Sequence, residues 1–474
     1  MKRTALISGH WWLFFAALPS ACAGIDAGGR EPVLTLPPVP GEARESGFPE
    51  QSSPVSQAPL QVPALAEASP QKAGAAPFPG MTELSVDALV EQVLARNPTL
   101  AQMTAAWQAA SARYPQVTSL EDPMFGLTTG PASIGSKDVD FANRVEATQK
   151  LPFFGKLKLR GQAALAEAAA ASNEVGDMRL QLIESAKMAF YDYYLVDRAI
   201  AVNEESLKLL REFRKTADDR FRANQTPQQD LLQADVEIGR QRKRGLALER
   251  MRKVTQARIN TLMHLPPDTP LPPPPKAIQL AESLPAASEL RARAVAQRPD
   301  LQALSSRIDA ERASLGLANK EYYPDFEIMG AYDAFWQRPE QDLRPMLGVR
   351  MNVPLYRERR RGAVAEAQAR LDQRIAELAA LTDQVNLQVQ EAYEQVLESE
   401  KSVRLYNETI LPAARENVKA ARTAYAAGSI PFLSLIEAQR NLVELRDSSY
   451  EELAEYYRRI ATLERVIGGP SPPQ

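Results

Sequence analysis

The sequence predicts a mainly α-helical protein with a small β part, in which one helix-strand-strand-helix unit occurs twice. Three observations support this fold class. Proline-marked segments recur at a nearly constant spacing, proline-poor windows are long enough for very long helices, and short segments alternate apolar and polar residues. A chain of 474 residues would ordinarily hold roughly two to four domains, and the recurrence reduces this to two repeats of one fold.

The N-terminal segment has the features of a signal peptide. Two basic residues precede an apolar run from Trp11 to Leu18, and small residues follow, so we expect residues 1–23 to form an export signal. Two processing sites compete. The Ala-Cys-Ala around Cys22 fits a small-x-small cleavage site, whereas the preceding Leu-Pro-Ser-Ala resembles a lipoprotein signal with Cys22 as the lipidated first residue. The chain has a single cysteine, and its position at this junction favours lipidation.

Prolines are concentrated between the predicted folded units. Residues 31–80 contain 11 of the 36 prolines, residues 265–275 contain 7, and residues 470–474 contain 3. The first segment has the composition of an extended, unpacked linker, and the second is a connector that no helix can cross. We therefore expect a Pro-rich linker over 24–83, a first repeat over 84–264, a connector over 265–285, a second repeat over 286–468 and a tail over 469–474.

Four segments of the first repeat recur in the second in the same order. The offset between matching prolines drifts by three residues, from 201 to 204. The pairs are Pro98 with Pro299, Pro123 with Pro324, Pro152 with Pro354, and Pro227 with Pro431. Ordered matches of this kind indicate an internal duplication, and each half has the order helix, two strands, long helix, turn, helix.

Each repeat contains a window that predicts one very long helix. Across residues 362–428 the single proline is Pro412, and apolar residues recur with the spacing of a coiled-coil seam. The seam consists of Leu371, Ile375, Leu378, Val385, Val389, Ala392 and Val396. The matching window is 156–223, and a helix of about 67 residues is about 100 Å long. Shorter helices over 86–118 and 227–264 can line such a helix.

Two short segments in each repeat have the period of a β-strand: 123–130 and 142–151, then 325–336 and 346–353. Their apolar faces contain Phe125, Leu127, Val145 and Ala147 in the first repeat, and Phe326, Ile328, Tyr332, Trp336, Leu347, Val349, Met351 and Val353 in the second. Taken alone, such hairpins would also suit the cover of a soluble core. The segment lengths, however, match tilted transmembrane strands.

Four strands cannot close a barrel, and exposed strand edges do not persist in lipid. Three protomers would supply twelve strands, and their helices would form a matching tube. Aromatic residues lie where interfacial belts are expected. They are Phe153, Phe154, Tyr322, Tyr323 and Tyr356 on the helix side, and Phe335 and Trp336 on the far side.

Composition argues against several other classes. The net charge of −3 gives no basic field for nucleic acid, and one Cys with two His excludes most zinc clusters. His264, at a helix end, fits a solvated or capping residue better than a base or ligand, and the chain has no phosphate-binding loop. We expect no enzyme activity, no cofactor and no resident metal. Methionines in the strands suggest copper, but adaptable packing against lipid or neighbours explains them better; they are Met124, Met329, Met346 and Met351.

Three segments of this chain resemble the TolC family of outer-membrane efflux proteins. They are Asn97-Pro98-x-Leu100, Leu151-Pro-Phe-Phe-Gly-Lys156, and Tyr425-Ala-Ala-Gly428 with the Leu433-Ser-Leu-Ile-Glu-Ala-Gln439 that follows. The second is similar to the heavy-metal branch of the cobalt-zinc-cadmium and copper-silver resistance type, with Phe154 where that branch usually has Pro. The resemblance covers about residues 84–468. It implies a homotrimer with a twelve-stranded barrel in outer-membrane lipid and a periplasmic helical tunnel. It also implies docking through a periplasmic adaptor (membrane fusion) protein onto an inner-membrane pump.

The helix turns farthest from the strands are the candidate functional site. We expect left-handed turn residues at Asn224 and Gly428, followed by Pro227 and Pro431 at the helix starts, and an adaptor would meet these turns. By the family resemblance, Ser434 and Glu437 correspond to positions that close the tunnel mouth, and their first-repeat counterparts are Asp230 and Gln233. Family members often have acidic residues at these positions; here Glu437 and Asp230 are acidic, and Ser434 and Gln233 are not. Carboxylates repeated around a three-fold axis would favour cations at the constriction. For Asp230, a plain helix-start charge is an equal alternative.

These observations predict a passive outer-membrane channel of a tripartite efflux system, carrying metal cations or drugs from the periplasm to the exterior. A periplasmic coiled-coil adaptor or scaffold lipoprotein is the alternative, because it would also have long helices and a lipid anchor. Such an adaptor usually has one hairpin and a β-rich domain rather than two full repeats. A hydrolase lacks candidate residues. The cargo depends on the pump and stays open.

Overall fold

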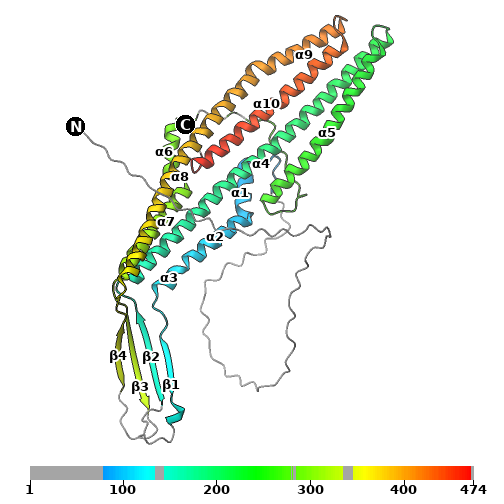
Figure 1. Ribbon diagram of the computed structural model, residues 1–474. Coiled ribbons are helices and arrows are strands. Elements are labelled where there is room, and N and C mark those ends of the chain that lie inside the picture. The colour runs from blue at the N-terminus through cyan, green and yellow to red at the C-terminus, as the bar shows by residue number, and fades with distance from the viewer. Residues whose placement is uncertain (1–77, 134–142, 279, 281–283, 335–344, 471–474) are drawn as a thin grey trace, which may run out of the picture. The chain divides into compact units, whose positions relative to one another are not determined.

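The computed structural model describes residues 78–133, 143–278, 280, 284–334 and 345–470 (Figure 1). Cys22 and the signal peptide, most of the predicted linker, Phe335, Trp336 and the last four residues of the tail lie outside this range. In the first repeat the elements are α1 (Val86–Arg96), α2 (Pro98–Ser111), α3 (Arg113–Thr118), β1 (Met124–Thr129), β2 (Asn143–Leu151), α4 (Lys156–Arg222) and α5 (Gln228–Leu262). In the second they are α6 (Ala287–Gln297), α7 (Pro299–Lys320), β3 (Phe326–Ala334), β4 (Met346–Met351), α8 (Arg357–Leu405), α9 (Leu411–Ala426) and α10 (Phe432–Val466).

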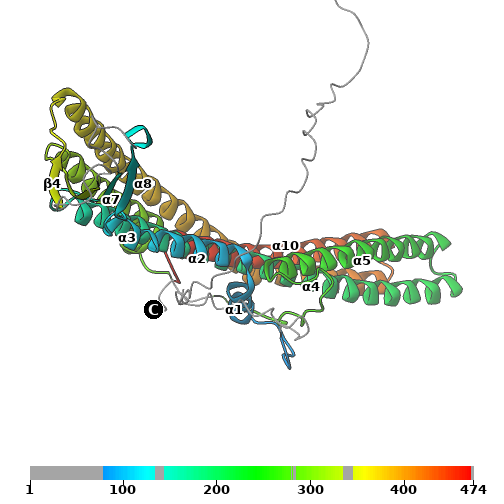
Figure 2. The same ribbon diagram turned by 90° about the horizontal axis from the view of Figure 1, so that it is seen from below.

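The predicted fold class is confirmed, since both repeats show the order helix, two strands, long helix, turn, helix. α2 and α3 correspond to α7, α4 corresponds to α8 with α9, and α5 corresponds to α10. α4 begins directly after the sheet and ends at the turn into α5, so the sheet and this turn lie at opposite ends of one helix (Figure 1). α5 and α10 both pack along α4 (Figure 2).

Asn97 explains why the first helical window is divided into α1 and α2. Its backbone is extended, with a ψ of 122°, and its Oδ1 accepts a hydrogen bond from the Thr99 N–H at 2.9 Å. Pro98 takes the first helical position, where its missing N–H leaves no hydrogen bond unmade. Asn97 Nδ2 also donates to the Leu262 carbonyl oxygen at 3.0 Å. The corner between α1 and α2 is therefore tied to the end of α5.

The second long helix is interrupted, unlike the continuous helix expected over 362–428. α8 ends at Leu405, a π turn spans Tyr406–Ile410, and α9 begins at Leu411. Pro412 is the physical reason, because it lacks an N–H and its ring crowds the carbonyl four residues earlier. The wider π turn relieves that crowding. α4 contains no proline and runs for 67 residues without a break.

The strands form one antiparallel sheet in the order β1-β2-β3-β4. The registers place the predicted apolar residues on one face. That face is uncovered, since Phe125, Leu127 and Leu347 are 78%, 72% and 87% exposed. The opposite face is polar and holds the ion pairs Arg144–Asp333 at 2.7 Å and Arg350–Glu327 at 3.3 Å. The amphipathic pattern read from the sequence is confirmed.

In the described part of the chain, three hydrophobic clusters hold the helices together. One surrounds Leu89 and Phe190 where α1, α4 and α5 meet, a second surrounds Val389 on α8, and a third surrounds Phe432 beside the helix turns. Residues before α1 join the first cluster, because Phe78 is buried in it. The Pro-rich connector packs there as well, and its Pro273 carbonyl oxygen accepts a hydrogen bond from the Leu84 N–H at 2.8 Å.

Within the described residues, no helix combines the length and the apolar character needed to cross a membrane.

Candidate gate and docking turns

The two turns between the long helices have the same backbone geometry. Asn224 and Gly428 adopt the expected left-handed conformation, with φ of 54° and 75°. The N–H of the next residue closes each turn, from Gln225 to the Arg220 carbonyl and from Ser429 to the Ala424 carbonyl, both at 2.9 Å. Pro227 and Pro431 are extended cap residues directly before α5 and α10. Their fixed φ starts each helix in the same way.

The turns of the two repeats are also joined to each other. The Arg220 guanidinium donates hydrogen bonds to the backbone carbonyls of Tyr425 and Ala426 and lies over the Tyr425 ring, 5.1 Å from its centroid. The Tyr425 hydroxyl donates to Asp230 Oδ2 at 3.1 Å. Burial raises the pKa of Tyr425 to about 12, and the adjacent Asp230 carboxylate adds to this. Tyr425 therefore keeps its proton and remains a hydrogen-bond donor.

The structure does not bring the four expected gate residues together within one protomer. Ser434 and Glu437 line a groove of about 470 Å³ between α9 and α10, which also contains Ala420, Ala424 and Ala438. Gln233 lines a different groove, between α5 and α10. Asp230 is half-buried and engaged by Tyr425, and it does not line either groove.

A buried carboxylate near the turns is missing from the residues singled out by sequence. Glu237 on α5 is 4% exposed. Arg440 on α10 donates two hydrogen bonds to this carboxylate, one from Nε to Oε2 at 2.9 Å and one from Nη2 to Oε1. Arg240, one turn along α5, donates to Oε1 at 2.7 Å. The Arg440 hydrogen bonds are the largest influence that lowers the pKa of Glu237 below its ordinary 4.5. The sequence shows Glu237 three residues before Arg240, a spacing that places both on one helix face. The other partner, Arg440, lies 203 positions away and is not visible from spacing.

A second ion pair joins α5 to α10 farther from the turns. Arg244 on α5 donates to Asp447 on α10. Burial raises the pKa of Asp447 above its ordinary 3.8, and Arg244 opposes the shift. Together with the Glu237 cluster, this pair adds ion pairs to the apolar contact between α5 and α10, in which Ile238 and Ile436 share one hydrophobic cluster.

The described residues contain no group of three or more His, Cys, Asp or Glu side chains able to hold a metal. The sequence favours lipid or packing contacts for the strand methionines, and the registers separate them. Met351 lies on the apolar face, while Met124, Met329 and Met346 share the polar face. Nη2 of Arg350 lies 3.6 Å from Met329 Sδ, so Met329 packs against a neighbouring side chain on the polar face.

The duplicated helical unit, the four-stranded sheet with its exposed apolar face and the paired turns are the architecture that the sequence predicts for an outer-membrane channel protein. The family model described as "Outer membrane efflux protein" matches residues 89–263 and 290–469. The chain therefore belongs to this family, the one that its sequence resembles, and is an outer-membrane efflux channel protein rather than an enzyme.

Individual relatives are distant. The cobalt-zinc-cadmium resistance protein CzcC of Cupriavidus metallidurans is 25% identical over 347 residues, covering 71% of this chain and 75% of CzcC. The outer-membrane channel OprN superposes with a TM-score of 0.68 at 20% identity, over 83% of this chain and 94% of that one. A CusC structure gives the same TM-score at 15% identity, over 84% and 98%. These structures agree on the fold.

Proposed function

We propose that the protein works as a homotrimeric passive duct, fed by a periplasmic adaptor and an inner-membrane pump. The observation that carries this proposal is the sheet. β1 and β4 are its two edges, and its exposed apolar face suits lipid. Three copies would pair β1 of one protomer with β4 of the next and so close a twelve-stranded barrel without free edges. The two repeats, 84–264 and 286–468, would then contribute equivalent halves of each protomer's wall.

Docking is assigned to the helix turns at Asn224, Pro227, Gly428 and Pro431. These turns lie at the ends of the long helices farthest from the sheet (Figure 1). Beside them, four alanines line the groove between α9 and α10 together with polar side chains such as Asn417 and Asn441, so an approaching helix meets little steric hindrance along the alanines. A helical hairpin of an adaptor could lay small or apolar side chains into this groove.

Gating is assigned to the first two turns of α5 and α10, which contain Asp230, Gln233, Ser434 and Glu437. Glu437 is exposed in its groove, and three copies would place three carboxylates around one axis. Such a ring raises the local concentration of cations. The hydrogen bond between Tyr425 and Asp230 links the two hairpins of one protomer, so it favours the arrangement in which they lie close together.

Metal cations are the proposed cargo, with drugs as the alternative. The support is the relationship to CzcC, whose name assigns it to cobalt, zinc and cadmium resistance, together with Glu437 at the mouth. Lipidation of Cys22 is proposed as an additional anchor.

The test is deletion of the gene followed by growth across metals and drugs, with periplasmic accumulation measured for each compound that becomes toxic. Loss of resistance to divalent metals, restored by the wild-type gene, is expected. Sensitivity to drugs alone would reject the metal assignment. Purified protein that sediments as a monomer in detergent and in its absence would reject the trimeric duct.

A further inference from the structure

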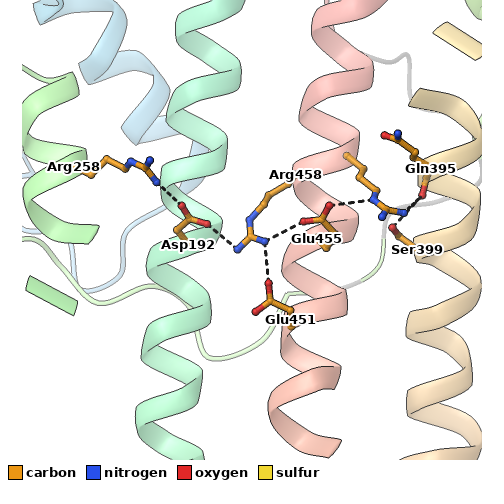
Figure 3. Close-up of polar contacts among 8 residues, drawn as sticks. Asp192, Arg258, Gln395, Ser399, Glu451, Glu455 and Arg458 are labelled. Atoms are coloured by element: carbon orange, nitrogen blue, oxygen red, sulfur yellow. Dashed lines mark hydrogen bonds and ion pairs between the residues drawn. The ribbon is translucent and has the colours of Figure 1, made fainter. Parts of the chain in front are cut away.

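A layer of charged side chains crosses four helices at the level of Asp192 (Figure 3). Asp192 on α4 accepts from Arg258 on α5 at 3.0 Å and pairs with Arg458 on α10 at 2.8 Å. The Asp192 carboxylate thus forms ion pairs with two guanidinium groups, one from α5 and one from α10. Arg458 in turn contacts Glu455 at 3.1 Å and Glu451 at 3.3 Å, both on its own helix.

The layer continues from α10 to α8. Arg459 donates to Glu455 at 3.2 Å, to Glu398 on α8 at 2.8 Å and to the Gln395 carbonyl oxygen at 2.8 Å. From α5 to α8 the charges therefore alternate in sign. The order is Arg258, Asp192, Arg458, Glu455, Arg459, Glu398.

The two ends of this series are its most exposed members and carry opposite charges. The Arg258 side chain is 67% exposed and that of Glu398 is 70% exposed. The four inner members are between 17% and 38% exposed. α5 packs on α4, α4 on α10 and α10 on α8, so α5 and α8 are the two outer helices of these four (Figure 3), and α6 and α7 also pack on α8.

We propose that the series closes into a ring across protomers, with Arg258 of each protomer paired to Glu398 of the next. This inference rests on the proposed trimer and names a contact that holds it together. Rotation about a three-fold axis along the helices keeps every layer at its own height, so the exposed Arg258 of one protomer meets the exposed Glu398 of its neighbour at the same level. The occupant of each edge is a second copy of this chain.

Charges flanking the two ends support the pairing. The α8 stretch 383–400 contains five acidic residues and no Lys or Arg, and its exposed members include Glu391, Glu394 and Glu398. The α5 stretch 239–258 contains eight Lys or Arg and one acidic residue, and Lys253 and Arg258 are exposed near the layer. An acidic edge and a basic edge thus reach the same layer from opposite sides. Opposite charges at a head-to-tail contact attract, and a reversed arrangement repels.

Charge reversal tests this contact. Arg258→Glu and Glu398→Arg are each expected to weaken the detergent-solubilised trimer, measured by light scattering across a dilution series. An exposed pair turned from attractive to repulsive changes each contact by about fivefold. The ring contains three such contacts, so the association constant should fall roughly a hundredfold. Higher salt should shrink the difference.

The double variant Arg258→Glu/Glu398→Arg separates a contact between protomers from one within a protomer. Inside one chain, the new Glu would face Asp192 and the new Arg would face Arg459, so a purely internal role predicts additive damage. Between chains, the new Glu meets the new Arg, so the proposal predicts that the trimer is recovered. Recovery with helix content preserved by circular dichroism supports the ring, and additive loss overturns it.

Arg312→Glu is the matched control. Arg312 is equally exposed, at 62%, but lies on α7, which packs between α4 and α8 and is not an edge helix. It should leave the association constant unchanged. A wild-type protein that is monomeric would reject the proposed duct itself. A wild-type trimer unaffected by either reversal would reject only the charge ring.

Discussion

Removing Arg440 should loosen α5 from α10 while leaving each helix intact. Arg440 supplies the two hydrogen bonds that reach Glu237 from the other helix, whereas Arg240 reaches it from the same helix. Arg440→Met keeps most of the side-chain volume and removes both hydrogen bonds. Arg240→Met removes a guanidinium from the same carboxylate without disconnecting the helices, and it is therefore the matched control.

The size of the effect follows from burial. A hydrogen bond to a charged group contributes about 1.5–3 kcal/mol, and an uncompensated buried charge costs about 3–5 kcal/mol. Arg240 still neutralises Glu237 in the variant, and the Arg440 side chain is 39% exposed, so solvent reduces both figures. We expect a net loss of about 2 kcal/mol, equivalent to roughly 30-fold easier local opening.

Hydrogen exchange read by mass spectrometry measures this opening directly. Peptides from α5 and α10 around Glu237 and Arg440 should lose roughly 30-fold in protection in Arg440→Met and less than about threefold in Arg240→Met. Peptides from α7 should not change. Equal losses in the two variants, or no loss in either, would refute the role of Arg440 as the link between helices.

Acid should mimic the loss of this contact. Folding lowers the pKa of Glu237 below its ordinary 4.5, so between the two pKa values the folded state binds fewer protons than the unfolded state. Stability then rises with pH across that window. The contribution of ionised Glu237 to the free energy of unfolding is fully present above about pH 5. It is lost as the pH falls through the pKa of Glu237 in the folded state. In Glu237→Gln, protection of the same peptides should no longer respond to pH in this window.

Four further predictions concern the turns and the anchor. Glu437→Ala should lower cation selectivity or raise single-channel conductance in planar bilayers, and an unchanged channel would remove Glu437 from the gate. Tyr425→Phe should lengthen channel openings by freeing Asp230, and identical open times would make that hydrogen bond irrelevant to gating. Gly428→Val, at a φ of 75°, should cost about 1–2 kcal/mol and reduce adaptor cross-linking, whereas normal cross-linking would exclude this turn from docking. Cys22→Ser should abolish labelling by radioactive palmitate yet leave trimers, and persistent labelling would exclude lipidation.

Local features of this fold could be predicted because each depends on neighbouring residues. Alternation of side chains places Phe326 and Ile328 on one face and Glu327 on the other, and the strand registers agree. Positive φ at Asn224 and Gly428 follows from the residue types that tolerate it. Even the polar placement of Met329 is readable from its spacing to Glu327.

Features that depend on distant residues could not be predicted. Glu237 becomes buried because α10 covers it, and its partner Arg440 is fixed by how two repeats pack rather than by spacing along a helix. Predicting the π turn at Tyr406–Ile410 would require a choice between two signals. One is a single proline, Pro412, and the other is a long heptad pattern, which is the stronger sequence signal for a continuous helix. Asp230 is a typical helix-start charge in sequence, and only the folded chain brings Tyr425 to it.

The π turn makes the two copies of the duplicated unit mechanically unequal. α4 is a single unbroken α-helix of 67 residues, so it resists bending between the sheet and its turn. The equivalent rod of the second repeat has a joint at Tyr406–Ile410, where Pro412 has already removed one rung and bending costs less. The chain thus contains one continuous long helix and one that is interrupted by a π turn. The sixteen residues of α9 follow the joint, and any change of angle there also moves the turn at Tyr425, which Arg220 and Asp230 bond to the first repeat.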